Sequence, residues 1–156
     1  MNTLQTGQSA PEFTLNNQDG HPVALTALLA KGPVLVYFYP KASTPGCTVQ
    51  AQGLRDSLAQ LQSKQVSVLG LSPDPVAKLK KFHDKQALNF DLLSDEDHAI
   101  ADAFGVWGEK KFMGKIYDGI HRLSFLIGTD GKVVKLFDKF KTKDHHQVVL
   151  DYLAAE

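Results

Sequence analysis

Residues 34–47 read VLVYFYPKASTPGC, and this stretch decides how the chain folds. Its first part, Val34–Tyr39, is an unbroken run of apolar and β-branched residues, which is typical of a central strand buried on both faces. A loop over 40–46 follows, and apolar residues near helical spacing then predict a helix over 47–63. This arrangement brings Cys47, the only cysteine of the chain, to the N-terminus of a helix.

Strands and helices alternate on both sides of this stretch. Short apolar segments around Asn-Asn-Gln-Asp-Gly predict an N-terminal hairpin, and Gly-Thr-Asp-Gly predicts another near the end of the chain. Thr26, Asp74 and Asp95 are the predicted helix N-caps, and Gly105 ends a helix. The predicted strands are 13–15, 23–25, 34–39, 66–71, 92–93, 122–127 and 132–137, and the predicted helices are 26–30, 47–63, one opening at 74–75, 95–104 and 143–154.

This order predicts an α/β protein with a central mixed β-sheet flanked by helices and an N-terminal hairpin. The 156 residues are the size of one domain, which we expect to span 1–156. The 17 basic and 17 acidic residues balance, so no basic stripe favours nucleic-acid binding. The longest apolar run is too short to cross a membrane. No export signal or disulfide framework is recognisable, and we therefore expect a cytoplasmic protein.

The environment predicted for Cys47 favours a reactive thiol. Amides at a helix N-terminus lack intrahelical partners and stabilise negative charge, and Arg122 is the best candidate for a cationic partner. Thr44 stands where a C-x-x-C dithiol would have its first cysteine, and its hydroxyl can donate to sulfur and accept from a peroxide. Pro40 and Pro45 stiffen the loop and restrict water around the sulfur.

The pattern Pro40-x-x-x-Thr44-x-x-Cys47 resembles the active-site motif of peroxiredoxins, and residues 36–51 resemble their Q-type (bacterioferritin comigratory protein) subfamily. Further similar segments are Gly-x-x-Ala-Pro-x-Phe, Leu-Leu-Ser-Asp, Phe-Gly-Val-Trp-Gly-Glu-Lys and Gly-Ile-His-Arg, at 7–13, 92–95, 104–110 and 119–122. The resemblance implies a thioredoxin-like fold. It also implies a thiol peroxidase that reduces hydrogen peroxide and organic hydroperoxides without a metal or organic cofactor.

The same resemblance implies a role for each residue of the motif. Cys47 would attack the terminal peroxide oxygen and become a sulfenic acid. Thr44 and Arg122 would hold the peroxide and stabilise charge as the O–O bond breaks, while Pro40 shields the sulfur. Gln50 would orient Arg122.

The chain departs from the subfamily at the second cysteine that many Q-type members use. The two usual positions hold Gln52 and His83 here, so we expect a one-cysteine enzyme. Its sulfenic acid would be reduced by an external thiol, in thioredoxin, glutaredoxin or a small molecule. The resemblance also implies a monomer or a weak dimer.

Several alternatives stay open at this point. Cys47 could serve a redox sensor or chaperone, or glutathione-peroxidase-like chemistry. We interpret His145-His146 as a solvated helix start rather than a metal site, and the Lys pairs at 80–81 and 110–111 as solvated faces. Residues 106–119 are expected to form a long loop in which Trp107 and Phe112 either line the pocket mouth or simply pack.

Overall fold

Helices and strands alternate along the chain in the computed structural model, which describes residues 1–155. In chain order they are β1 (Thr14–Asn16), β2 (Pro22–Ala24), α1 (Leu25–Leu29), β3 (Val34–Phe38), α2 (Pro45–Ser63), β4 (Ser67–Ser72), α3 (Val76–Lys85), β5 (Asp91–Ser94), α4 (Ala99–Phe104), β6 (Trp107–Phe112), β7 (Lys115–Ile120), β8 (Ser124–Ile127), β9 (Val133–Phe137) and α5 (His145–Ala154).

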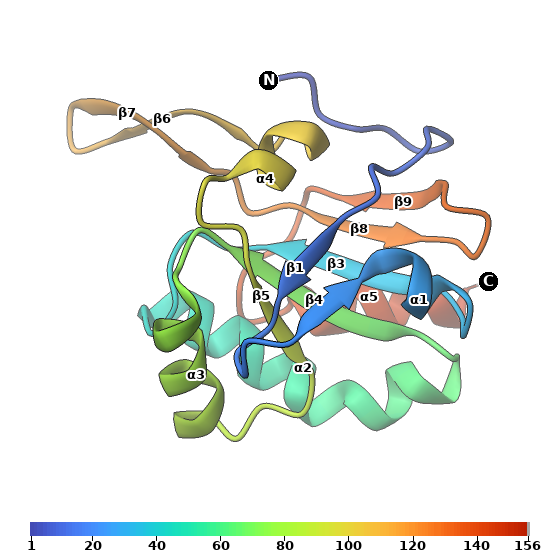
Figure 1. The fold of residues 1–156 in the computed structure, drawn as a ribbon. Helices are drawn as coiled ribbons and strands as arrows, with labels where there is room; N and C mark the ends of the chain where they lie inside the picture. Colours follow the sequence, from blue (N-terminus) through green and yellow to red (C-terminus); the bar gives the residue numbers. More distant parts are fainter. Residues whose placement is uncertain (156) are drawn as a thin grey trace.

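Strand β3 is the middle strand of a five-stranded sheet with the order β5-β4-β3-β8-β9. Strands β4 and β5 continue the sheet in parallel, whereas β8 and β9 join it as an antiparallel hairpin. The predicted mixed sheet and the N-terminal hairpin β1–β2 are both confirmed. Figure 1 shows α2 and α5 on one side of the sheet, with α1 and the N-terminal hairpin on the other.

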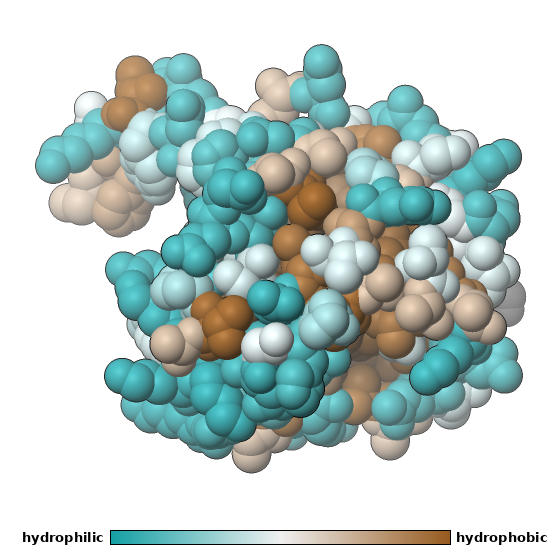
Figure 2. Space-filling view, viewed as in Figure 1, coloured by the Kyte–Doolittle hydropathy of each residue, from teal (hydrophilic) through white to brown (hydrophobic). Residues whose placement is uncertain are grey.

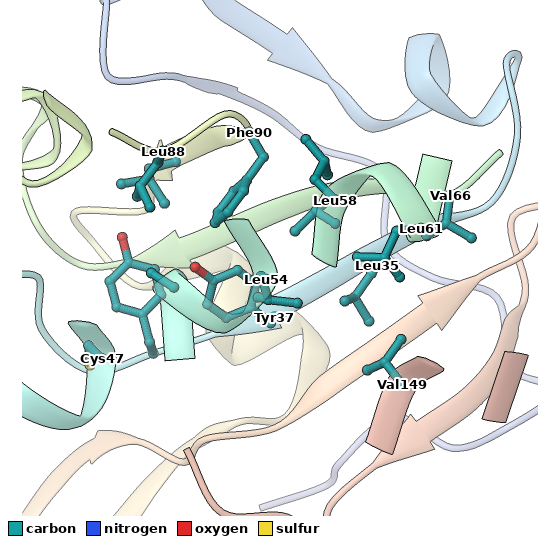
Figure 3. Packing of buried hydrophobic residues seen from close by; sticks show 14 of the residues in the cluster. Leu35, Tyr37, Cys47, Leu54, Leu58, Leu61, Val66, Leu88, Phe90 and Val149 are labelled. Atoms are coloured by element: carbon teal, nitrogen blue, oxygen red, sulfur yellow. The ribbon is translucent and has the colours of Figure 1, made fainter. Parts of the chain in front are cut away.

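Alternate side chains of β3 enter two separate hydrophobic clusters, because successive residues of a strand point to opposite faces. Leu35 and Tyr37 pack with residues of α2, α3 and α5, and Figure 3 shows this cluster with Cys47 at one end. Val34, Val36 and Phe38 pack with α1, α4 and the N-terminal segment. Every residue of β3 is buried, as the apolar run predicts.

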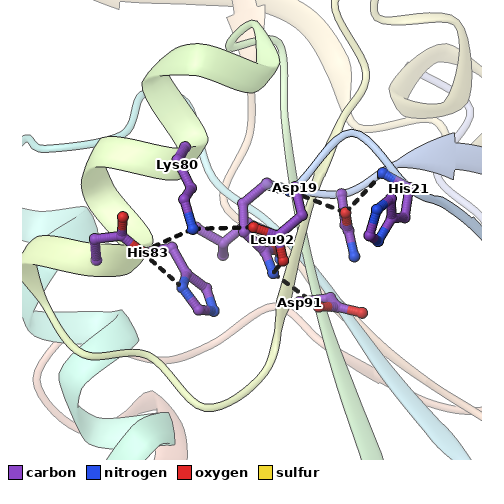
Figure 4. A network of polar contacts seen from close by, with 9 residues as sticks. Asp19, His21, Lys80, His83, Asp91 and Leu92 are labelled. Atoms are coloured by element: carbon purple, nitrogen blue, oxygen red, sulfur yellow. Dashed lines mark hydrogen bonds and ion pairs between the residues drawn. The ribbon is translucent and has the colours of Figure 1, made fainter.

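A polar network ties the turn of the N-terminal hairpin to the edge of the sheet (Figure 4). Gln18 donates from Nε2 to Asp91 and accepts at Oε1 from the backbone N–H of Leu92, both at 3.0 Å. Lys80 Nζ of α3 lies 3.0 Å from an Asp19 carboxylate oxygen. The hairpin thus becomes part of the α/β body.

None of the three predicted N-cap residues occupies the N-cap position. Helix α1 has Ala24 at its N-cap, so Thr26 lies inside the helix. Helix α3 has Pro75 at its N-cap, and the Asp74 carboxylate is instead used by the loop before α2.

Asp95 caps the first amides of α4 although it lies outside the helix. The N-cap itself is His98 in a left-handed conformation, with φ of 51°. The Asp95 carboxylate nevertheless accepts from the N–H groups of Ile100 at 3.1 Å and Ala101 at 2.8 Å. Gly105 ends the helix with φ of 71°, as predicted.

Residues 106–119 do not form the expected loop. They contribute most of an antiparallel hairpin, β6–β7, paired from Trp107↔Ile120 to Phe112↔Lys115. Its turn residues Met113 and Gly114 both have positive φ, 51° and 79°, as a two-residue turn matching the strand twist requires. The sequence pattern missed it because charged residues interrupt the apolar alternation. None of the helices in residues 1–155 has the length and apolar character needed to cross a bilayer.

Candidate active site

Cys47 lies in the first turn of α2, and its side chain is buried among apolar residues. The helix begins at Pro45, two residues earlier than predicted, which makes Cys47 its third residue. Proline suits the first helical position because its fixed φ matches the helix and its missing N–H has no partner to lose there. The residue is 1% exposed, so its sulfur is shielded from bulk water, and its place in the first turn sets it near the helix-end amides.

Arg122 reaches Cys47 because β8 is the antiparallel neighbour of β3. Tyr37 pairs with Ser124, so the start of β8 lies beside the end of β3. Arg122 Nη1 donates to the Cys47 sulfur at 3.3 Å and to Gln50 Oε1 at 2.7 Å. The structure therefore brings together the three predicted residues Cys47, Arg122 and Gln50, although 75 residues separate the first two along the chain.

Thr44 is the N-cap residue of α2, and its hydroxyl does not point its proton at the sulfur. Thr44 Oγ1 donates to the carbonyl oxygen of Lys41 at 2.8 Å. The prediction that this hydroxyl donates to Cys47 is thus wrong for this conformation. Its lone pairs stay available to accept a hydrogen bond from a peroxide.

Asp74 holds the loop before α2, a role that the sequence reasoning missed. Its Oδ2 accepts from the backbone N–H of Ala42 at 2.7 Å and from Ser72 Oγ at 2.8 Å, and the carboxylate is buried. Ser43, the next loop residue, has φ of 66°. The available signal was that β3 and β4 are parallel, so the segments that follow them meet at one sheet edge.

Two tyrosines of the β3 segment form an apolar wall behind the sulfur. Tyr37 and Tyr39 stack with ring centroids 5.5 Å apart, and both are 1% exposed. Burial raises the pKa of each phenol well above its usual value, so both stay neutral. Such surroundings strengthen the interaction between a thiolate and the Arg122 guanidinium.

A cleft of about 280 Å³ opens beside this site, between the loop that precedes α2 and the β6–β7 hairpin. Pro40 and Lys41 line one side, and Trp107, Lys110 and Tyr117 are among the residues on the other. A larger hollow of about 570 Å³, between β1 and the start of α3, contains no cysteine. Neither hollow is lined by Cys47 itself, but the smaller cleft is lined by Pro40 of the predicted site and by Lys110, which lies within electrostatic range of Cys47 and Arg122. We therefore take the smaller cleft as the entrance to the candidate site.

The cleft settles three sequence interpretations. Trp107 lines it, with its ring stacked 3.8 Å from that of His98, whereas Phe112 projects at the far end of the hairpin. Lys111 is exposed, as expected, but Lys110 is half-buried and donates to the carbonyl of Ile120 at 2.8 Å. Burial, followed by the nearby Arg122 charge, lowers the pKa of Lys110.

The two positions where a second cysteine was considered carry polar side chains. Gln52 Nε2 donates to Gln86 Oε1 at 2.9 Å, and His83 Nδ1 lies 3.7 Å from an Asp84 oxygen. Cys47 is the only cysteine in the sequence, so no disulfide can form within the chain.

His145 does not begin a solvated helix face, and that interpretation is wrong. The residue is fully buried, its Nε2 lies 2.7 Å from Ser124 Oγ, and its ring contacts Phe140. Burial is the main cause that lowers its pKa to about 3, with His146 and Arg122 adding to the effect. Among residues 1–155, no three His, Cys, Asp or Glu side chains are grouped to hold a metal ion.

Comparisons with known proteins agree with this geometry. The model of the AhpC/TSA family matches residues 6–136. Peroxiredoxin Bcp of Escherichia coli is 60% identical over 153 residues, which cover 98% of this chain and 97% of that protein. Peroxidoxin BcpB of Mycobacterium tuberculosis has a similar structure, with a TM-score of 0.87 at 37% identity over 97% of both chains.

A second similar structure adds a chemical activity. The bacterioferritin comigratory protein of Xanthomonas campestris, described in terms of its alkyl peroxide reduction activity, superimposes with a TM-score of 0.85. It is 36% identical over 92% of this chain and 90% of the other.

Proposed function

This chain belongs to the AhpC/TSA family, as a peroxiredoxin of the Bcp type, and on that premise we propose that Cys47 is its peroxide-reducing sulfur. The protein is a thiol peroxidase that reduces hydrogen peroxide and alkyl hydroperoxides. The observation that carries the assignment is Arg122 Nη1 at 3.3 Å from the sulfur, in the first turn of α2.

In the proposed reaction, the Cys47 thiolate attacks the terminal oxygen of the hydroperoxide. The S–O bond forms as the O–O bond breaks, and the sulfur is oxidised by two electrons to a sulfenic acid. The other oxygen leaves with the electron pair of the broken bond and takes a proton to become an alcohol or water. Arg122 stabilises the negative charge as that charge moves from the sulfur to the peroxide oxygens. Thr44 accepts a hydrogen bond from the protonated peroxide oxygen, and Pro40, in the wall of the cleft, shields the sulfur.

The return half of the cycle needs a thiol from outside the chain. The sulfenic acid reacts with one external thiol to give a mixed disulfide and water, and a second thiol then releases Cys47 as an external disulfide forms. We propose thioredoxin, glutaredoxin or a small thiol as the reductant. We also propose that residues 1–156 act as one domain, as a monomer or weak dimer, in the cytoplasm, where thiols are kept reduced.

The test is a stoichiometric reaction with peroxide, followed by intact-mass analysis. We expect the protein to gain one oxygen and lose it again on treatment with dithiothreitol. That second step separates a sulfenic acid from a methionine sulfoxide, which matters because Met113 is 86% exposed. Cys47→Ser should abolish both the reversible gain and the turnover.

Two outcomes would contradict the assignment. One is turnover that survives in Cys47→Ser, and the other is a second-order rate of Cys47 oxidation no faster than that of free cysteine. Turnover should also be assayed with thioredoxin, glutaredoxin and small thiols in parallel. Disulfide-linked dimers on non-reducing gels during turnover would show instead that two subunits reduce each other.

A further inference from the structure

The β6–β7 hairpin exposes large apolar side chains that the fold itself does not use. Phe112 is 65% exposed, Met113 86%, Ile116 63% and Tyr117 46%. Figure 1 shows the hairpin projecting from the body of the molecule, and Figure 2 shows the surface hollowed beneath it, with apolar residues near its tip. Large apolar side chains left exposed together on one element are typical of an interaction site.

One face of the hairpin continues the wall of the active-site cleft. Directly paired residues of an antiparallel ladder share a face, and the face alternates at each step along the strand. At the base of the hairpin the cleft is lined from both faces, by Trp107, Asp118 and Ile120 as well as by Gly119. Further out the cleft is lined by the pair Lys110↔Tyr117 and not by Lys111 or Ile116. The pair Phe112↔Lys115, two residues further out, therefore lies on the same side. We call these four residues the cleft face.

The opposite face of the hairpin provides a natural comparison. Lys111 pairs with Ile116, so these two side chains point away from the cleft. Ile116 is 63% exposed and Phe112 65% exposed, which makes them a matched pair of apolar residues on opposite faces. Lys111 and Lys115 are the corresponding pair of exposed charges.

The proposed reaction cycle requires a thiol to reach a deeply buried sulfur. Cys47 is 1% exposed and has no second cysteine in the chain to relay its oxidation. The cleft beside it lies between Lys41 on the loop side and Trp107 on the hairpin side. A protein that brings a thiol to this cleft has to approach along the hairpin wall.

The charges around this entrance indicate the kind of partner. Lys41, Lys110 and Lys115 gather along the cleft and its hairpin wall, against one acidic residue of the cleft lining, Asp118. The whole chain carries no formal net charge, so this cationic bias is local. A complementary surface combines an apolar patch with carboxylates at its rim.

We propose that the cleft face is the docking surface for a protein thiol reductant whose thiol is surrounded by apolar residues with an acidic rim. The inference rests on the proposed function, because the docked thiol reduces the Cys47 sulfenic acid. Phe112 packs into the apolar patch of the partner, while Lys115 faces its carboxylates.

The test compares Phe112→Ser with Ile116→Ser, using thioredoxin as the protein reductant and dithiothreitol as the small one. Phe112→Ser should slow reduction of the sulfenic acid by thioredoxin about tenfold, as truncation of an interface anchor does. Ile116→Ser should stay within about twofold of the original protein by the same reasoning. Oxidation by peroxide and reduction by dithiothreitol should be unchanged in both variants.

A second pair of variants tests the charge component. Lys115→Glu should slow reduction by thioredoxin more than Lys111→Glu does, and the difference should shrink as salt is added. Equal effects of the two charge reversals at every salt concentration would remove the acidic rim from the proposal.

Other results would overturn the docking surface itself. One such result is an equal effect of Phe112→Ser and Ile116→Ser on the rate of reduction by thioredoxin, including no effect of either. Another is a rate of reduction by thioredoxin that is no faster than the rate with dithiothreitol. A dimer that Phe112→Ser dissociates without slowing thioredoxin would assign the face to a second copy of the chain. Failure of the proposed function is distinct, because it would appear as slow oxidation of Cys47 by peroxide.

Discussion

Replacing Arg122 by glutamine tests the central contact of the active site. The substitution removes a positive charge whose Nη1 lies 3.3 Å from the Cys47 sulfur. At that separation, two unit charges attract by about 5 kcal/mol at an effective dielectric constant of roughly 20. Arg122 is only half-buried, so solvent reduces this value, and hydrogen bonds to charged groups contribute about 1.5–3 kcal/mol. We therefore expect a barrier higher by about 2–3 kcal/mol, which slows Cys47 oxidation about 30- to 150-fold.

The assay is the second-order rate constant of Cys47 oxidation, measured by rapid mixing with hydrogen peroxide and quenching for intact-mass analysis. Arg122→Lys keeps the charge and should lose less than Arg122→Gln. Arg55→Gln is the matched control, because Arg55 lies on α2, the helix that carries Cys47, but is paired with Asp56. Thermal unfolding should establish that each variant is folded.

A role for the Arg122 charge is contradicted if Cys47 in Arg122→Gln is oxidised at a rate within about a factor of two of the original protein, because the loss of one charged hydrogen bond predicts a much larger decrease. It is also contradicted if Arg122→Lys is as slow as Arg122→Gln, because geometry rather than charge would then control the rate.

Three further predictions concern stability. Unfolded histidine titrates near 6.5 but burial lowers the pKa of His145 to about 3, so folding stability should fall as pH drops through that range. His145→Gln should flatten this fall in urea midpoints, and an unchanged slope would contradict it. Gly53→Ala would drive a Cβ into the His146 ring, and this overpacking, at about 1–3 kcal/mol, should outweigh the roughly 1 kcal/mol that alanine gains over glycine inside a helix, so the unfolding free energy should fall. When His146→Ala is added, the same substitution should become stabilising. Asp74→Ala leaves the Ala42 N–H unpaired, so urea unfolding should show a loss of about 1–3 kcal/mol, and unaltered hydrogen exchange at Ala42 would argue otherwise.

The sequence was sufficient to predict the elements whose patterns are local. A pattern within a short stretch of consecutive residues predicts β3, the helix that carries Cys47 and the closing β8–β9 hairpin. Arg122 was predicted as the cationic partner of Cys47 and again through the resemblance to the family, and the antiparallel pairing of β3 with β8 explains why it reaches the sulfur.

The features that were missed depend on distant partners. Asp74 looks like a helix cap in sequence, yet the parallel neighbours β3 and β4 bring its carboxylate to the loop before Cys47 instead. His145 looks solvated beside Lys143 and Asp144, but Ser124 and aromatic rings surround it in the fold. Lys110 was predicted to lie on a solvated face, because its burial depends on how the hairpin folds against the loop that precedes α2, and the local sequence does not show this.

The distance of 75 residues between the sulfur and its guanidinium makes the active site a natural reporter of chain assembly. The connection between α3 and β5 exposes Ala87 and Asn89, and exposed connections are where a chain best tolerates a break. A cut there would leave Cys47 on one fragment and Arg122 on the other, with each fragment inert alone. Peroxide consumption would then measure how often the two fragments find each other, which turns an antioxidant enzyme into a split-protein sensor.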